Sequence, residues 1–279
     1  YNEHHTRGEV AIDVEAAVVM PDDTVRVTRR WRDTSIDQDF RLVADGLEIR
    51  TSVDWHAQDC LLRLECDLDV LAPSTSAETM YGFVQRPTAT NTSWEQAKFE
   101  TCAHRWVHAA EPGYGITVLT PTTYGHQVTR QQREGGGIYT RIGCSLLRSA
   151  AFPDPRRDSG RHEFVHVVAP GTDIADAVRL ADEQSFGIRA VLGAGPVAPA
   201  VEVTGDSVAL EALKLAEDGS GDVIVRVREV RGTASPASVR LGVAASAVEC
   251  DLIERPLGEI DAHALRLRPF EVKTLRFRR

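Results

Sequence analysis

Apolar and polar residues alternate with a period of two along most of the chain. The clearest run extends from Leu62 to Val70, where apolar residues occupy the even positions and charged residues the odd ones. The same alternation, or a shorter apolar run, recurs at residues 10–18, 47–55, 116–119, 164–168, 223–227 and 239–243. Because successive side chains of a strand point to opposite faces, the pattern predicts half-buried strands, which are typical of antiparallel sheets. We therefore predict an all-β protein.

One segment follows a helical period instead. Thr172 and Asp173 are candidate N-caps, and apolar residues follow at positions 174, 177, 178 and 181. This i, i+3, i+4, i+7 spacing predicts one short helix over residues 173–184. The stretch 191–199 after it is uncharged and rich in glycine, alanine and proline, as linkers are. We predict a large antiparallel β-sandwich, or super-sandwich, over residues 1–195 and a small immunoglobulin-like β-sandwich over 196–279.

Composition and charge exclude several classes of partner. The 279 residues are 42% hydrophobic and 26% charged, values that are ordinary for a soluble globular protein. No apolar run approaches the roughly 20 residues that a membrane-spanning helix needs. The net charge of −9 disfavours nucleic acid, and the basic residues of 266–279 alternate with apolar ones, as on the wet face of a last strand. We expect neither a nucleic-acid partner nor a membrane partner.

The five cysteines are odd in number, widely spread and contain no CxxC pair. We expect free thiols in a reducing compartment, since a chain of this length does not need disulfides. Only three of the 32 basic residues are lysines, a bias that is associated with GC-rich bacterial genomes. The expected location is the bacterial cytoplasm.

Motifs of catalysis and metal binding are missing from the sequence. There is no GxSxG, Walker loop, HExxH or cysteine-rich zinc pattern. Histidines recur at i, i+4 in the pairs His104/His108 and His162/His166. Both pairs lie in strand-like or loop-like context, where this spacing separates the rings by about 13 Å. We predict no metal site in this chain.

Aromatic residues concentrate between Met80 and His166, interleaved with arginine, histidine and carboxylate side chains. Aromatic faces beside a few polar groups suit a sugar, which presents C–H patches and hydroxyls together. The alternative is that these aromatic rings fill the interior of a large sandwich while the polar groups hold long loops in place. Composition alone leaves both interpretations open.

Many short stretches resemble the C-terminal β region of the α-mannosidases of glycoside hydrolase family 38. They occur in the same order, from about residue 20 to the end, without large gaps. The principal matching stretches are Val53-Asp54-Trp55-His56, Arg86-Pro87-Thr88, Asn91-Thr92-Ser93-Trp94, Ala103-His104-Arg105-Trp106, Glu111-Pro112-Gly113-Tyr114-Gly115, Ser145-Leu146-Leu147-Arg148-Ser149, Pro153-Asp154-Pro155 and Leu267-Arg268-Pro269-Phe270-Glu271.

The resemblance implies part of an enzyme. Members of this family carry a zinc ion and a nucleophilic aspartate in an N-terminal α/β domain, followed by a helical bundle and then by β domains like these. Retaining hydrolysis needs two carboxyl groups about 5 Å apart, and the stretches that carry this chemistry do not occur here. The resemblance thus implies the non-catalytic C-terminal portion of a retaining, zinc-dependent α-mannosidase, inactive by itself. It implies no catalytic residue and no cofactor in this chain, with the zinc in the catalytic domain of the same enzyme. Its expected partners are the N-terminal catalytic and helical domains of the same enzyme and mannose-containing glycans; homo-oligomerisation stays open.

The resemblance also implies candidate substrate-binding residues. In the family, an arginine after a leucine-rich strand approaches the sugar pocket, and Arg148 matches that position. Asp154, Asp158 and His162 follow it in a proline-containing loop. The alternative for Arg148 is a salt bridge to Asp154 or Asp158 that only orders the loop. Four more candidates come from the other matching stretches: Arg86, Trp94, Trp106 and Glu111.

Two rival functions stay open at this point. The chain could be a free-standing carbohydrate-binding or sugar-epimerising β-sandwich that shares only the architecture, or a purely structural module. Half of a divided sugar site should bind weakly, so binding tighter than about millimolar without a partner domain would favour the free-standing module.

Overall fold

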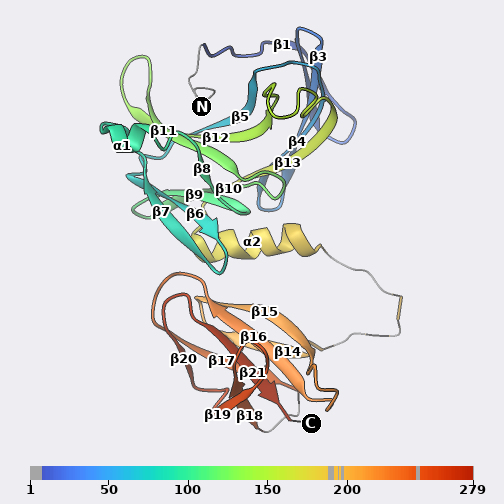
Figure 1. Cartoon of the computed structure of the whole chain (residues 1–279), viewed down its shortest axis with the longest axis vertical. Helices are drawn as coiled ribbons and strands as arrows, with labels where there is room; N and C mark the ends of the chain where they lie inside the picture. The colour runs from blue at the N-terminus through green and yellow to red at the C-terminus, as the bar shows by residue number, and fades with distance from the viewer. Residues whose placement is uncertain (1–7, 188–191, 194, 196–197, 243–245, 279) are drawn as a thin grey trace. The chain divides into compact units, whose positions relative to one another are not determined.

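The structure is a computed structural model that describes residues 8–187, 192–193, 195, 198–242 and 246–278. The chain divides into two compact units, the first formed by residues 1–78 and 84–173 and the second by 79–83 and 174–279. Strands dominate both units (Figure 1). The predicted all-β fold class is confirmed.

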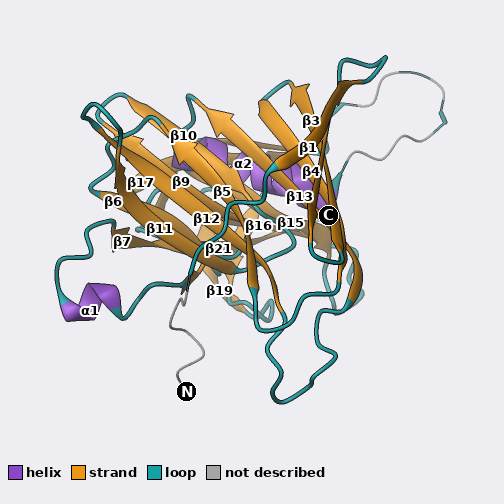
Figure 2. Cartoon of the chain, turned by 90° about the horizontal axis from the view of Figure 1, so that it is seen from above, coloured by secondary structure: helices purple, strands orange, loops and turns teal. Residues whose placement is uncertain are grey.

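The first unit contains two sheets. A nine-stranded sheet has the order β1 (Val14–Val19), β2 (Val25–Trp31), β3 (Thr34–Val43), β4 (Gly46–Trp55), β13 (Gly160–Pro170), β10 (Tyr114–Leu119), β9 (Trp106–Glu111), β6 (Ser74–Thr79) and β7 (Gly82–Pro87). A four-stranded sheet has the order β5 (Leu61–Leu68), β12 (Ile138–Arg148), β11 (Gly125–Gln132) and β8 (Thr101–Cys102). The short helix α1 (Ser93–Gln96) lies between β7 and β8 in the sequence. Figure 2 shows these strands in a second view.

The two sheets of the first unit pack face to face around a shared core. Val107 and Val118 of the nine-stranded sheet and Ile142 and Cys144 of the four-stranded sheet belong to one buried cluster. The run from Leu62 to Val70 behaves as its alternation predicts, because its even-numbered residues at both ends are buried. Burial of alternate side chains therefore fixes which face of β5 looks inward.

The pattern at residues 10–18 gives a different outcome. The strand there is β1, and all six of its residues are exposed, with Val14 at 51% and Val18 at 56%. Because β1 is the edge strand of the nine-stranded sheet, only β2 flanks it. Its apolar residues consequently do not mark a buried face.

The second unit has two sheets of its own. One has the order β14 (Val201–Thr204), β17 (Ser235–Leu241), β20 (Leu265–Leu267); the other has the order β15 (Val208–Leu215), β16 (Val223–Glu229), β21 (Val272–Phe277), β18 (Ala247–Cys250), β19 (Pro256–Ile260). Val239 and Leu265 of the first sheet share a core with Val225 and Leu275 of the second, so this unit is a sandwich as well. The helix α2 (Ile174–Phe186) occupies the predicted helical segment and groups with this unit.

The predicted domain boundary at 195/196 stays a prediction. Residues 188–191, 194 and 196–197 lie outside the described part of the chain. The two units separate between Asp173 and Ile174, and residues 79–83, from the last residue of β6 to the second residue of β7, group with the second unit.

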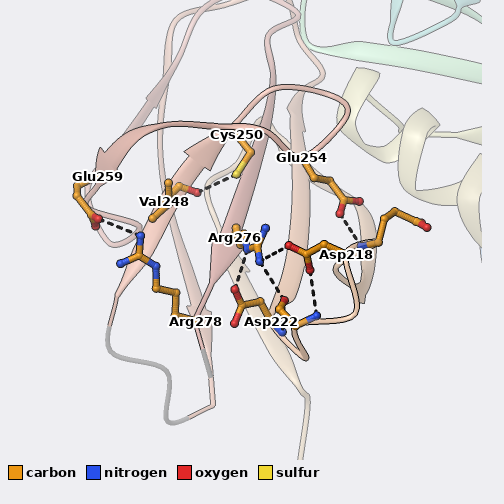
Figure 3. A network of polar contacts seen from close by, with 10 residues as sticks. Asp218, Asp222, Val248, Cys250, Glu254, Glu259, Arg276 and Arg278 are labelled. Atoms are coloured by element: carbon orange, nitrogen blue, oxygen red, sulfur yellow. Dashed lines mark hydrogen bonds and ion pairs between the residues drawn. The ribbon is translucent and has the colours of Figure 1, made fainter.

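Ion pairs neutralise much of the basic C-terminal segment. Arg276 on β21 contacts Asp218 and Asp222, each at 2.7 Å (Figure 3). Arg278 lies 3.5 Å from Glu259, and Lys273 lies 2.7 Å from Glu249. In these ion pairs, the basic side chains are neutralised by carboxylates of the same unit. None of the helices in the described part of the chain is both long and apolar enough to span a bilayer.

Candidate functional site

The loop between β12 and β13 joins the two sheets of the first unit. β12 ends at Arg148 in the four-stranded sheet, and β13 begins at Gly160 in the nine-stranded sheet. Arg148 lies opposite Leu61 at the start of β5, and Gly160 lies opposite Trp55 at the end of β4. The loop therefore crosses one end of the sandwich, beside the connection between β4 and β5.

This neighbouring connection holds the base of the loop. Trp55, which is buried, donates from its indole nitrogen to Ser149 Oγ at 2.7 Å. The main chains of Asp59 and Ser149 are joined at 2.6 Å, and the Ser149 N–H donates to the Cys60 carbonyl at 3.2 Å. Trp31 stacks on Trp55 with ring centroids 6.1 Å apart. Buried hydrogen bonds and aromatic packing together give the loop a fixed starting point.

Asp158 contacts two of the other candidate residues. Its carboxylate accepts the main-chain N–H of Arg148 at 2.8 Å, and its carbonyl accepts from His162 Nε2 at 2.9 Å. The second bond places a proton on Nε2 of His162. The ring of His162 also stacks on Phe164, with an angle of 12° between the planes. Asp158 adopts the left-handed backbone conformation (φ 61°), which aspartate tolerates better than most residues.

Asp154 shapes the loop by a local turn. Its Oδ1 accepts the N–H of Arg156 at 2.9 Å, and its carbonyl accepts the N–H of Arg157 at 3.2 Å. Asp154 therefore orders the tip of the loop through main-chain groups.

The half-buried Arg148 supplies the hydrogen-bond donors of this group of residues. A guanidinium carries five N–H donors in a fixed fork, and the carboxylates of Asp154 and Asp158 supply acceptors in the same loop. Donors and acceptors at the end of a sandwich can orient the hydroxyls of a small polar ligand. We name Arg148, Asp154, Asp158 and His162 the loop site.

The other four predicted residues lie outside the loop site. Trp94 stands on α1 with 79% of its surface exposed, and Figures 1 and 2 both show α1 apart from β13. Arg86 on β7 reaches the Cys102 carbonyl at 3.5 Å. Trp106 is 1% exposed in β9, and Glu111 accepts the Leu71 N–H at 2.9 Å. Hydrogen bonds thus bring together three of the eight candidates, Arg148, Asp158 and His162, and Asp154 lies in the same loop as Asp158.

Metal binding finds no support in the described residues. Within these ranges, no group of three or more histidine, cysteine, aspartate or glutamate side chains is placed so that it could hold a metal ion. The residues of the loop site therefore do not fit a zinc ion, and we derive no chemical step through zinc in this chain.

Two protein families match this chain, and they show which family it belongs to. The family described as "Glycosyl hydrolases family 38 C-terminal domain" matches residues 2–156, more than half of the chain. A second family, "Glycosyl hydrolases family 38 C-terminal beta sandwich domain", matches residues 207–275. The chain belongs to glycoside hydrolase family 38. The family 38 resemblance drawn from the short sequence stretches is confirmed.

Relatives of this family 38 chain are α-mannosidases. It is 32% identical over 246 residues to "Alpha-mannosidase 2C1" of Homo sapiens, covering 82% of this chain and 23% of that protein. It is 29% identical to "Alpha-mannosidase" of Saccharomyces cerevisiae, covering 82% of this chain and 24% of the relative. The chain therefore spans about a quarter of the length of the curated relatives it matches.

A solved structure shares the fold. "The crystal structure of an alpha-mannosidase from Enterococcus faecalis V583" superposes with a TM-score of 0.71 at 19% identity. The match covers 91% of this family 38 chain and 29% of that one. The two chains thus share a fold over most of this chain.

One pair beside the loop site was not singled out from the sequence. His56 Nε2 lies 3.1 Å from Asp54 Oδ1 at the end of β4, and Asp54 pairs in register with Arg161 at the start of β13. Both residues belong to the family 38 stretch Val53–His56. The signal that could have found them is the i, i+2 spacing, which puts two side chains on one face of a strand.

Proposed function

We propose that this chain is the non-catalytic C-terminal β portion of a longer, retaining, zinc-dependent α-mannosidase. In that enzyme it completes the sugar-binding cleft and supports assembly. The observation that carries the proposal is the match of two family 38 C-terminal families, in order, to a chain that spans about a quarter of its α-mannosidase relatives. The rest of the longer polypeptide would supply the two carboxyl groups that retaining hydrolysis requires.

The loop site is the part of this chain that we assign to the cleft. Arg148 would orient substrate hydroxyls through its fork of donors. Asp158 is a positioning residue, because its carboxylate holds the main chain of Arg148 and its carbonyl holds His162. Asp154 orders the tip of the loop. Trp106 and Glu111 would belong to the scaffold of the sandwich, and Arg86 and Trp94 to a separate surface.

We also propose that the protein works in the bacterial cytoplasm. All five cysteines are free thiols, which suits a reducing compartment.

Activity measurements with two polypeptides test the proposal. An aryl α-mannoside is assayed with zinc, using this chain and the longest polypeptide whose reading frame contains it. We expect turnover from the longer polypeptide and none from this chain. In the longer polypeptide, Arg148→Lys should lower kcat/KM at least about tenfold, because an ammonium cannot reproduce the planar fork. Turnover by this chain alone, comparable to that of the longer polypeptide, would overturn the proposal.

Calorimetric titration distinguishes the proposed function from that of a free-standing carbohydrate-binding module. Mannose and mannobiose are titrated into this chain without any other domain. We expect binding weaker than about 1 mM, since the cleft would be incomplete. Tighter binding would identify a free-standing carbohydrate-binding module instead.

A further inference from the structure

Two histidines lie inside the first unit, between its two sheets. His126 on β11 is 1% exposed and His166 on β13 is 0% exposed. His126 lies opposite Cys144, a member of the main core cluster. His166 shares its strand face with Phe164 and Val168. Phe164 belongs to one buried cluster and Val168 packs against another, and both clusters contain residues of the four-stranded sheet. The two rings thus approach from opposite sheets.

A hydrogen bond determines which ring nitrogen of neutral His126 carries the proton. Its Nδ1 lies 3.1 Å from the Tyr124 carbonyl, which can only accept, so Nδ1 carries the proton and Nε2 is left as a bare acceptor. Among the described residues, His126 Nε2 and both ring nitrogens of His166 have no hydrogen-bond partner. A proton added to either ring would therefore create a buried charged donor with no protein acceptor, which is strongly unfavourable.

The groups packed around the pair offer little compensation. On the side of the four-stranded sheet, the titratable neighbours are Cys144 on β12 and Glu100 ahead of β8. Glu100 affects the pKa of His126 less than burial does, and its carboxylate already accepts from Ser145 Oγ. Cys66 on β5 lies in the same cluster as Cys144.

The neighbour of His166 on β4 is apolar. In register, His166 faces Ile49 of β4. The charged neighbours of Ile49 along that strand, Glu48 and Arg50, point to the other face of the sheet, where they form an ion pair. No carboxylate of β4 is thus placed to receive a proton from His166.

We propose that His126 and His166 form an acid-sensitive joint between the two sheets, and that protonation of either ring opens the sandwich. The titration of the rings agrees with this geometry. Burial lowers the pKa of His126 to about 4, against smaller upward effects of the Tyr124 carbonyl and Glu100. Burial, together with repulsion from His126, also lowers the pKa of His166 to about 4.

The sign of the pH dependence follows from these pKa values. In the unfolded chain a histidine titrates near 6.5, so between pH 6.5 and 4 the unfolded state binds up to two more protons than the folded state. Stability is therefore unaffected by the pair above about pH 6.5 and falls progressively as the pH decreases toward 4. Between pH 7 and 5 each histidine raises the unfolding constant roughly 20-fold, and the pair roughly 500-fold.

The joint is connected to the loop site through two strands. β12 carries Cys144, opposite His126, and Arg148 four residues later; β13 carries His162, and His166 four residues later. Four residues of strand span about 13 Å. Opening between the sheets would therefore separate the two ends of the β12–β13 loop. This consequence for the cleft rests on the proposed function, whereas the opening itself does not.

Equilibrium unfolding of the chain in urea between pH 8 and 5 tests the joint. The test variant combines His126→Asn, whose amide can still donate to the Tyr124 carbonyl, with His166→Phe, which loses no hydrogen bond to a described residue. The exposed His263→Asn is the matched control. We expect the unfolding constant of the wild type and the control to rise roughly 500-fold more than that of the double variant between pH 7 and 5. Equal rises in wild type and double variant would overturn the proposal.

A second measurement decides the matter if the double variant does not fold. Histidine ring C–H resonances of the wild-type chain are followed by NMR from pH 8 to 5, with the single variants for assignment. We expect the two rings not to shift while the protein stays folded. A folded-state midpoint near 6.5 for either ring would contradict the proposal.

Activity of the longer polypeptide tests the consequence for the cleft. Loss of α-mannosidase activity at low pH should move to lower pH in the double variant. If the sandwich opens as expected but activity is indifferent to the double variant, the joint stands and the role of the loop site in the cleft fails.

Discussion

Trp55 and Ser149 are joined by a hydrogen bond of 2.7 Å between the indole N–H and the serine Oγ, although they lie 94 residues apart in the sequence. Trp55 ends β4 in one sheet, and Ser149 is the first residue after β12 in the other. The bond therefore ties together the two sheets at the place where the β12–β13 loop begins. A single side-chain contact thus connects the core of the sandwich to the candidate site.

Replacement of Ser149 by alanine should destabilise the first unit. Trp55 is 1% exposed, so the Ser149→Ala variant leaves a buried N–H without its acceptor. We expect the free energy of unfolding to fall by about 1–3 kcal/mol. Urea unfolding measures the change, with the exposed Ser52→Ala on β4 as control, for which we expect less than about 0.5 kcal/mol. A result for Ser149→Ala no larger than for Ser52→Ala would contradict the structural role of the bond.

Asp158 should affect activity through geometry. In the longer polypeptide, Asp158→Ala removes the acceptor for the Arg148 N–H and places an unfavourable residue at a positive φ. Misplacement of a substrate-orienting group by about 1 Å can reduce a rate by about 100-fold, so we expect kcat/KM to fall at least about tenfold. Asp158→Asn keeps an acceptor oxygen and tolerates the same backbone conformation, and it should restore most of the activity. Equal losses in the two variants would indicate that the charge of Asp158 itself is used.

The cysteines should divide into reactive and inert thiols. Burial, aided by the nearby carboxylates of Asp67 and Glu65, raises the pKa of Cys66 to about 12, and burial raises that of Cys144 as well. Because the thiolate is the nucleophile, both should resist iodoacetamide at pH 8 in the folded protein. Cys102 is exposed and should be alkylated first. Peptide mapping by mass spectrometry measures the order, with Cys102→Ser as control; labelling of Cys144 as fast as Cys102 would show that the core is open.

Local patterns predicted much of the fold. The alternation from Leu62 to Val70 and the helical spacing after Asp173 each depend on residues a few positions apart, and the structure has β5 and α2 there. Exposure of β1 could not be predicted in the same way, because it depends on which strands flank it. Periodicity reports the conformation of a segment but not its place in a sheet.

The candidate site could be predicted only where its residues are close in sequence. Asp158 lies in the β12–β13 loop, Arg148 and His162 lie on the two strands that this loop joins, and the structure brings the three together. Trp106 and Trp94 have the same residue type in neighbouring motifs, yet one is 1% exposed and the other 79%. The approach of His126 to His166 depends on the packing of two sheets, which no local pattern encodes. Aromatic and polar composition therefore could not distinguish a buried ring from an exposed one.

Glu229 should be the most sensitive carboxylate of the second unit. It is 0% exposed, and its two oxygens accept the main-chain N–H groups of Arg231, Gly232 and Phe270 at 2.8, 2.7 and 2.9 Å. The ring of Phe270 in turn packs edge-on against Phe83, with centroids 5.3 Å apart. One buried carboxylate therefore orders two separate loops and fixes the position of an aromatic contact.

Substitution of Glu229 by glutamine tests that arrangement. The amide nitrogen of the Glu229→Gln variant would face main-chain N–H groups, so at least one buried donor loses its acceptor and the remaining bonds lose their charge. We expect the free energy of unfolding of the second unit to fall by about 2–5 kcal/mol. Glu202→Gln is the matched control, because Glu202 forms an exposed ion pair with Arg240 and such pairs contribute about 0–1 kcal/mol. Thermal unfolding measures both variants. A Glu229→Gln variant as stable as the Glu202→Gln control would mean that the two loops keep their conformation without the carboxylate, and that Phe270 is positioned by its own packing.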